Sequence, residues 1–549
     1  MKNTLFALLT LLFVAIGTNV HSQEVYKFWV QLHDKAGSTY TLDAPHDYLG
    51  PRALERRQRQ AIALDSLDLP VSQAYLQAFR QAGFTVQNRS KWLNGVTLFA
   101  ADSARAELLG DMPFVDTVIF CERSTVEAPD LAAGGAGQPY APMPYDSVYD
   151  SGYYRYSYPQ IAQLGGISLH RNGFEGQGLI IGVCDGGFPS VDTACFFRSM
   201  RDEGRLLATR DFVWSGNQVF SINGHGTKVL SLMASYLPGF FVGTAPQASY
   251  VLCRTENTER ETILEEYNWI SAAEYLDSLG ADIITTSLGY FTFDDSTQNH
   301  TMDDLDGQTT PMSVAANIAV SRGMLVVNAA GNNGSEGTGR LLTPADAQRV
   351  LTVGAADIDN SWASFSSFGP TADQRIKPDV MALGVEVYGA TAEGMLSTNG
   401  GTSLATPIMA GMMACLWQRY PALTPDQLCD SVRAWGSLAA LPDTRAGYGI
   451  PDFSRAFPPD TVPAVGMEPT LCSDLLFRLW PNPCRDVLTL EVPGSASAVL
   501  IQDMMGRVVM RVPATASRFS VSLAGVPRGL YFVTVVSPAA SGTQRLLVQ

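Results

Sequence analysis

The sequence is short of positive charge and, after its first residues, of long apolar runs. It has 37 lysines and arginines against 53 aspartates and glutamates, a formal net charge of −16. This balance argues against nucleic acid or an anionic membrane as a partner. No stretch after residue 22 is apolar for long enough to cross a bilayer, so we expect no transmembrane segment in the mature chain.

Paired cysteines and metal-binding spacings are also absent. None of the eight cysteines forms a C-x-x-C pair, so a zinc ribbon or thioredoxin-type motif has no support. Cys184, Cys253 and Cys415 lie in apolar runs and are interpreted as buried thiols rather than disulfide partners. No EF-hand spacing is present. We therefore predict no metal or other cofactor, with a calcium ion as the alternative that stays open.

The chain begins with the features of an export signal. Lys2 precedes an apolar run over 5–17 and then Val20-His21-Ser22, so residues 1–22 are predicted to be a signal peptide. A composition of 46% hydrophobic and 16% charged residues indicates globular domains rather than disorder. Composition shifts predict a domain over 23–125, a Gly/Ala/Pro linker over 126–149, a large domain over 150–457, a proline-containing linker over 458–475 and a module over 476–549.

The domain over 23–125 combines strand and helix patterns. Strands are expected over 26–32 and 115–120, and helices over 49–64 and 72–82. These elements predict a small α/β unit. The first helix carries a basic run, which we interpret as a solvated face: Arg52, Arg56, Arg57 and Arg59.

The domain over 150–457 alternates apolar strands with helices, the pattern of an α/β fold. The predicted strands are 178–184, 249–253, 282–287, 324–328 and 350–354, and the predicted helices include 262–279 and 313–322. Functional groups of such sheets lie beyond the carboxyl ends of the strands. Asp185, Ser287 and the loop over 329–334 have that position. The module over 476–549 has short strands and frequent turns, which predicts a small all-β sandwich.

The segment 400–407, Gly-Gly-Thr-Ser-Leu-Ala-Thr-Pro, runs into an apolar stretch of helical length. We place Pro407 in the first helical turn, where its missing N–H would be unpaired in any case. Ser403 then lies at a helix N-terminus, where free N–H groups favour negative charge. Two interpretations fit: a serine that caps a buried helix, or a nucleophile whose developing charge the N-terminus stabilises.

A nucleophilic serine needs a base, and the sequence has no histidine after Ser403. The order serine, acid, histidine of the α/β-hydrolases is therefore excluded, whereas the order aspartate, histidine, serine stays open. Asp185 follows a buried strand, His225 lies between two glycines, and Asn332 lies in a Gly/Asn turn. Each has an ordinary structural explanation when taken alone. The six histidines are His21, His33, His46, His170, His225 and His300.

Taken together, these residues resemble the subtilisin-like serine peptidases. The segments that carry the resemblance are Asp185-Gly186-Gly187, Gly224-His225-Gly226-Thr227, Ser287-Leu288-Gly289, Ala330-Gly331-Asn332 and Gly401-Thr402-Ser403-Leu404-Ala405-Thr406-Pro407. The resemblance implies a doubly wound, mostly parallel sheet, with Asp185, His225 and Ser403 as a catalytic triad. It also implies Asn332 in the oxyanion hole, and a substrate-binding set of Ser287, Leu288, Gly289, Ala330 and Gly331. The implied reaction is hydrolysis of peptide bonds in polypeptide substrates through an acyl-enzyme.

The sequence departs from this family at Gly186, where threonine, serine or alanine is usual. A hydroxyl at this position could help solvate the Asp185 carboxylate, and glycine has none. A catalytically inactive secreted binding or adhesive protein on the same scaffold is the competing interpretation. The complete set of Asp185, His225, Asn332 and Ser403 favours the peptidase, because an inactive scaffold has no reason to keep all four.

The flanking regions fit an exported peptidase. Residues 23–125 resemble, by size and position, the inhibitory propeptides of these enzymes. Residues 476–549 resemble the C-terminal sorting domains of Bacteroidetes type IX secretion substrates, through Trp480-Pro481-Asn482-Pro483, Gly529-Leu530-Tyr531 and the terminal Arg545-Leu546-Leu547-Val548. This resemblance implies export through the periplasm to the cell surface or medium, with the type IX machinery as a partner. A carbohydrate- or protein-binding β module is the alternative for this region.

Overall fold

The computed structural model describes residues 24–125, 149–336, 340–457, 477–492, 498–503, 508–514, 516–536 and 541–549. The chain divides into two compact units, residues 1–457 and 458–549. The predicted signal peptide, the linker over 458–475 and all but Tyr149 of the linker over 126–149 lie outside the described residues. Within those ranges, none of the helices has the length and apolar character needed to span a membrane.

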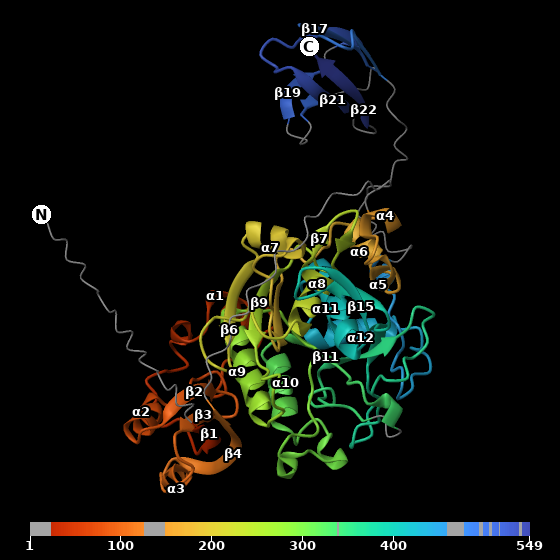
Figure 1. Ribbon diagram of the computed structural model, residues 1–549. Coiled ribbons are helices and arrows are strands. Elements are labelled where there is room, and N and C mark those ends of the chain that lie inside the picture. The colour runs from red at the N-terminus through yellow and green to blue at the C-terminus, as the bar shows by residue number, and fades with distance from the viewer. Residues whose placement is uncertain are drawn as a thin grey trace, which may run out of the picture. The chain divides into compact units, whose positions relative to one another are not determined.

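A parallel sheet of seven strands forms the centre of the first unit (Figure 1). Its order is β13-β12-β11-β10-β5-β9-β6, and every neighbouring pair is parallel. Strand order reverses at β5, which has β9 on one side and β10 on the other, and a crevice opens at such a reversal. The doubly wound parallel sheet predicted from the sequence is thereby confirmed. The strands are β5 (Ile180–Asp185), β6 (Leu206–Asp211), β9 (Ser249–Arg254), β10 (Ile283–Thr286), β11 (Leu325–Ala329), β12 (Leu351–Ala356) and β13 (Val380–Leu383).

Two layers of helices cover this sheet. Along β5, Ile181 and Val183 join one apolar cluster and Cys184 joins another, because successive side chains point to opposite faces. The first cluster includes α8 and α11, and the second includes α9 and α10, which lie side by side in Figure 1. Both faces of the sheet are therefore buried, as in other parallel sheets. The helices are α8 (His225–Ala234), α9 (Leu264–Leu279), α10 (Pro311–Ser321) and α11 (Thr402–Arg419).

Shorter elements complete this α/β domain. Its other helices are α4 (Ser151–Tyr154), α5 (Tyr158–Ala162), α6 (Ile167–Arg171), α7 (Arg198–Asp202) and α12 (Pro425–Ala434). Two hairpins pair β7 (Tyr236–Leu237) with β8 (Phe241–Val242) and β14 (Val387–Ala390) with β15 (Leu396–Asn399). Cys184, Cys253 and Cys415 are buried free thiols, as predicted.

Residues 24–125 form an antiparallel sheet in the order β2-β3-β1-β4, with its own apolar core. The predicted helix over 49–64 ends earlier, at Arg59. Ala61 adopts a φ of 55°, a left-handed conformation that does not continue a helix. The elements are β1 (Glu24–Leu32), α1 (Pro51–Arg59), α2 (Gln73–Gln81), β2 (Thr85–Ser90), β3 (Gly95–Ala100), α3 (Arg105–Gly110) and β4 (Val115–Thr125).

This N-terminal domain packs on α9 of the α/β domain. The ring of Trp29 stacks on Tyr267, with centroids 4.1 Å apart. The Glu274 carboxylate accepts hydrogen bonds from the Ser90 hydroxyl and from the backbone N–H groups of Lys91 and Trp92. The interface therefore combines aromatic packing with buried polar contacts.

The basic run of α1 belongs to this interface, so the interpretation as a solvated face is wrong. Arg56 and Arg57 are 1% and 2% exposed. Both donate to the carboxylate of Asp277 in α9, Arg57 at 2.9 Å, and Lys91 Nζ lies 2.8 Å from the same carboxylate. Helical periodicity shows that the arginines share a face. It does not show that a carboxylate 220 residues away in the sequence meets that face.

The second unit is all-β, as predicted. Its sheets, β16-β17-β20 and β19-β18-β21-β22, are antiparallel and share one apolar core. Leu488 and Leu490 of β17 point into this core together with Val499 and Ile501 of β18, at the alternating positions that a half-buried strand requires. The strands are β16 (Arg478–Trp480), β17 (Val487–Glu491), β18 (Ala498–Gln502), β19 (Val508–Pro513), β20 (Arg518–Ser522), β21 (Gly529–Val536) and β22 (Ser541–Val548).

Candidate active site

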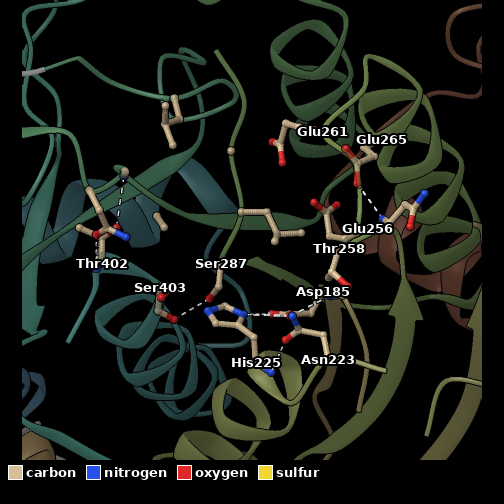
Figure 2. Close-up of a pocket in the computed structure, with 18 residues that line it drawn as sticks. Asp185, Asn223, His225, Glu256, Thr258, Glu261, Glu265, Ser287, Thr402 and Ser403 are labelled. Atoms are coloured by element: carbon tan, nitrogen blue, oxygen red, sulfur yellow. Dashed lines mark hydrogen bonds and ion pairs between the residues drawn. The ribbon is translucent and has the colours of Figure 1, made fainter. Parts of the chain in front are cut away.

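A cavity of about 420 Å³ lies beyond the carboxyl ends of β5, β9, β10 and β11, where the strand order reverses (Figure 2). The sequence predicted Asp185, His225, Asn332 and Ser403 as functional residues, and all four line this cavity. Asp185 ends β5, His225 begins α8, and Ser403 is the second residue of α11. The fold therefore brings together groups that are more than 200 residues apart in the sequence.

Asp185 and His225 form a hydrogen-bonded pair. The Nδ1 atom of His225 lies 2.9 Å from each carboxylate oxygen. Asp185 is fully buried, and the backbone N–H of Gly186 donates to its Oδ1 atom at 2.8 Å. Burial disfavours the charged imidazole, but the negative charge of Asp185 and its hydrogen bond outweigh this effect and raise the pKa of His225. The pair holds the ring in one orientation with Nδ1 facing the carboxylate.

Ser403 lies at the start of α11, after the N-cap Gly401. A Cβ atom at Gly401 would lie 2.9 Å from Ser403 Oγ, so glycine leaves the hydroxyl uncovered. Ser403 and His225 line the same cavity, although no hydrogen bond joins their side chains in the described part of the chain. Catalytic contacts of this kind often tighten only when substrate is bound.

Pro407 lies in the second turn of α11, so its predicted place in the first turn is wrong. The helix starts at Thr402, five positions before the proline. Because Pro407 has no N–H, the carbonyl of Ser403 lacks its helical partner. The Ser287 hydroxyl donates to that carbonyl at 2.7 Å instead. The side chain of Ser287 therefore fixes the backbone of Ser403.

Asn332 is held by Thr402. Its Oδ1 atom accepts from the backbone N–H of Thr402 at 2.9 Å and from its hydroxyl at 3.1 Å. These bonds fix the amide and leave its Nδ2 donors for the cavity. The first N–H groups of a helix have no intrahelical partner, and that of Ser403 is one of them. Two such donors beside a nucleophile form the arrangement that stabilises an oxyanion.

The predicted substrate-binding residues divide into two groups. Ser287, Leu288, Gly289 and Gly331 line the cavity. Ala330 is outside the wall, fully buried in a small apolar cluster. Ala329, the last residue of β11, lines the cavity in its place.

The cavity-lining residues of the segment that follows β9 were not identified from the sequence. Glu256, Asn257, Thr258, Glu261 and Glu265 all line the cavity, as do Asn223 and Leu342. The rule that pointed to Asp185 would have found the first of these, since they come directly after the carboxyl end of a buried strand.

The glutamates of this wall are unusual acids. Burial, together with the nearby charges of Glu261 and Asp185, raises the pKa of Glu256 to about 8. Burial also raises the pKa of Glu261 to about 7, with a contribution from Asp294. The pKa of Glu265 is raised for the same reason. The cavity therefore disfavours negative charge on all three.

Thr258 explains the departure at Gly186. A Cβ atom at position 186 would lie 2.7 Å from the methyl carbon of Thr258. The space that a larger residue would occupy is therefore filled from the loop after β9. Asp185 receives a backbone hydrogen bond from Gly186, so it has a donor without a neighbouring hydroxyl.

Comparison with known proteins identifies the family. A model of the subtilase family matches residues 176–453, just over half of the chain. The chain belongs to the subtilase family. Residues 27–133 match a peptidase S8 propeptide domain of Bacteroidota, and residues 478–549 match a secretion system C-terminal sorting domain. The sorting domain indicates secreted or cell-surface export.

This subtilase is similar to serine protease AprX of Bacillus subtilis (strain 168), with 31% identity over 290 residues that cover 47% of the chain and 61% of AprX. Subtilisin DY of Bacillus licheniformis is 29% identical over 262 residues, 47% of the chain and 84% of that protein. Subtilisin E of Bacillus subtilis (strain 168) is 30% identical over 277 residues, 50% of the chain and 64% of that protein. The chain thus spans less than two thirds of AprX and of subtilisin E.

Proposed function

We propose that this subtilase is an exported endopeptidase that cleaves polypeptides through an acyl-enzyme formed on Ser403. The observation that carries the proposal is the Asp185–His225 hydrogen-bonded pair, which shares one cavity with Ser403 and Asn332. A nucleophile, a base, a carboxylate that orients the base and a pair of oxyanion donors are the groups that acyl transfer requires.

In this mechanism, Ser403 Oγ attacks the scissile carbonyl carbon while Nε2 of His225 takes its proton. Asp185 keeps Nδ1 of His225 protonated and stabilises the imidazolium. The oxyanion accepts hydrogen bonds from Asn332 Nδ2 and from the Ser403 N–H. The imidazolium then protonates the leaving amine, which departs with the C-terminal part of the substrate. Water attacks the ester with His225 as base, and the bond to Ser403 breaks.

The direct test is Ser403→Ala in the full-length chain, with Ser361→Ala, an exposed serine, as the control. Ser403→Ala should abolish peptide hydrolysis and labelling by a serine-directed fluorophosphonate, and Ser361→Ala should change neither. Undiminished hydrolysis by Ser403→Ala would contradict the assignment. A folded wild-type protein that neither hydrolyses peptides nor becomes labelled would favour the inactive binding scaffold instead.

We also infer that residues 476–549 are the address read by the type IX secretion machinery. The family match and the separate all-β unit support this role. Deletion of these residues in the native host should leave active enzyme in the periplasm. Arrival of the truncated enzyme at the cell surface or in the medium would favour a binding module.

The N-terminal domain is proposed to be a propeptide that folds with the α/β domain and blocks it. The propeptide match and the buried interface on α9 support this role. Residues 23–125 added in trans should inhibit the mature enzyme. Failure to inhibit at micromolar excess would favour a permanent accessory domain.

A further inference from the structure

One wall of the cavity carries three glutamates, two of them buried, without positive partners among the described residues. Figure 2 shows Glu256, Glu261 and Glu265 grouped on the side of the cavity away from Ser403. In the ranges that the structure describes, no lysine, arginine or histidine lies within ion-pair distance of any of the three. Among the described residues, the basic side chain in ion-pair contact with Asp185, which lines the same cavity, is His225.

Two buried carboxylates of the described chain, Asp277 and Asp379, are neutralised by cations of the protein, whereas others, such as Glu274 and Asp346, accept hydrogen bonds from neutral donors. Asp277 contacts Arg56, Arg57 and Lys91. Asp379 lies 2.8 Å from both Lys377 and Arg433. A buried charge without a partner is costly, and at Asp277 and Asp379 the protein supplies the cations itself. The wall of the cavity differs from these two sites because its carboxylates line a cavity that a ligand can enter.

The hydrogen bonds of this wall leave acceptors free. Glu265 is satisfied, since its two oxygens accept the backbone N–H groups of Asn257 and Thr262 at 2.7 and 2.9 Å. In Glu256, Oε1 accepts from both Tyr290 and Thr255, whereas Oε2 has no donor among the described residues.

Asn257 gives an independent indication of a ligand. It is 8% exposed and lines the cavity, but its side-chain amide makes no hydrogen bond within the described part of the chain. Buried amides are normally satisfied. The oxygens of Glu256, Glu261 and Asn257 therefore form an acceptor set that awaits a donor.

A metal ion is not the occupant that this geometry favours. Among the described residues, no group of three or more histidine, cysteine, aspartate or glutamate side chains is placed to hold one. The ligand that is certain to enter this cavity, if the proposed function holds, is a polypeptide with its scissile bond at Ser403.

We propose that Glu256, Asn257 and Glu261 form a subsite that selects a lysine or arginine side chain in the peptide substrate, at a position other than the residue whose carbonyl is attacked. This inference rests on the proposed function. A lysine ammonium brings three donors and an arginine guanidinium five, all of them charged. Their hydrogen bonds to carboxylates are about twice as strong as neutral ones. A neutral side chain would leave the acceptors unsatisfied, which is the basis of strong discrimination.

The raised pKa values of Glu256 and Glu261 add a signature that a purely structural role would not give. Selectivity for a cation requires ionised carboxylates, so it should increase as the pH rises through 7 to 8. Glu256 faces Asp185, His225, Glu261, Glu265 and Tyr290, and Glu261 faces Asp294 and Glu265. The ionisation of His225 affects all substrates equally and cancels in a ratio of rates.

The test uses enzyme purified from expression of the full-length chain, with active sites counted by fluorophosphonate labelling. Internally quenched peptides would carry arginine, citrulline, lysine or norleucine at one position at a time. Citrulline and norleucine match the shape of arginine and lysine without the charge. At one position we expect kcat/KM for arginine over citrulline, and for lysine over norleucine, to be about ten- to a hundredfold. The ratio should increase from pH 6.5 to pH 8.5.

Glu256→Gln and Glu261→Gln should each lower this ratio about tenfold. Glu259→Gln, an exposed glutamate of the same loop that is not part of the wall, should leave it unchanged. Glu261→Arg should reverse the preference toward glutamate at that position. Glu261 is exposed and has no side-chain partner among the described residues, so its variants remain informative if Glu256→Gln fails to fold.

Three results would overturn the proposal. Hydrolysis with ratios near one at every position would refute the subsite and leave the proposed function standing. A preference for basic residues that survives both glutamine variants would locate the selectivity elsewhere. Absence of both labelling and hydrolysis in the wild type would remove the proposed function, and the subsite with it.

Discussion

The two ends of α9 hold buried carboxylates in opposite ways. At the N-terminal end, Glu265 accepts backbone N–H groups and faces the cavity without a cation. In the last turn, Asp277 is surrounded by Arg56, Arg57 and Lys91 of the N-terminal domain. The helix dipole accounts for part of this contrast, because it favours negative charge at the N-terminus and disfavours it at the C-terminus.

The comparison of Asp277 with Glu256 shows where the protein places its positively charged side chains. Burial alone would raise the pKa of Asp277, but Lys91, Arg57 and Arg56 hold it below its usual range. Burial raises the pKa of Glu256, and among the described residues the opposing contacts are hydrogen bonds from Tyr290 and Thr255 rather than a cation. At the interface, the cations that pair with Asp277 belong to the protein. In the cavity, the carboxylates remain available to a ligand.

The largest effect should come from Asp185, the carboxylate of the cavity that does have a basic partner. Asp185→Asn would remove the charge that stabilises the imidazolium and would favour the wrong tautomer of His225. We expect kcat to fall about 10⁴-fold. Steady-state kinetics on a neutral peptide, corrected for labelled active sites, would measure it. Glu259→Gln serves as the control, and a loss below tenfold would show that Asp185 does not orient the base.

Asp277→Asn should disrupt the buried ion-pair network at the C-terminal end of α9. It would leave Arg56, Arg57 and Lys91 buried around a neutral group, which costs about 3–5 kcal/mol of stability. Chemical denaturation of the full-length Ser403→Ala protein, which cannot cleave itself, would measure the change. Asp116→Asn removes an exposed pair with His33 and should change the stability far less, because solvent screens such a pair. Equal effects of the two substitutions would mean that the buried network adds little.

Gly186→Ala tests the packing between Asp185 and the loop after β9. The new methyl would press on Thr258, and overpacking of this kind typically costs about 1–3 kcal/mol. We expect a lower melting temperature and a modest loss of kcat. Thr258→Ser in the same chain should restore both, because it removes the methyl carbon that clashes. If Thr258→Ser does not restore the melting temperature and kcat, contact with Thr258 does not explain the glycine at position 186.

The smallest effect is a displaced pH profile. Because Asp185 raises the pKa of His225, the base becomes protonated at a higher pH than an ordinary histidine, whose pKa is 6.5. The activity toward neutral peptides should therefore fall on the acid side with a midpoint above 6.5. The charges that face His225 are those of Asp185, Glu256 and Lys228. A midpoint at or below 6.5 would show that burial outweighs the carboxylate.

The strand and helix pattern was enough to predict the fold class, and the resemblance of the motifs to the subtilisin-like peptidases pointed to the central groups of the candidate site. The apolar strands that end at Asp185 and before Ser287 predicted a parallel sheet with functional groups at its carboxyl edge. The absence of histidine after Ser403 left one order open for a triad. These inferences depend on short-range patterns and on order along the chain, and both are visible in one sequence.

What sequence reasoning missed depends on distant partners. Arg56 and Arg57 were predicted to be solvated because their partner, Asp277, is distant in the sequence and no local pattern indicates it. Pro407 was placed one turn too early, since a residue pattern does not show that Ser287 satisfies the carbonyl that proline leaves free. Glu256 was overlooked because a glutamate in a loop is usually exposed, and only the fold shows this one to be buried.

The arginines on α1 also bear on how the N-terminal domain would meet α9 if it were supplied as a separate chain. Arg56, Arg57 and Lys91 converge on Asp277, so opposite charges would attract one another before contact. That attraction reaches about 10 Å at 0.1 M ionic strength and shortens as salt is added. Once the surfaces close, the same ions are shielded from solvent and are screened far less. The rate of association should therefore depend on salt much more than the rate of dissociation, so the ionic strength around the secreted protein would govern how quickly the domain is recaptured rather than how long it stays.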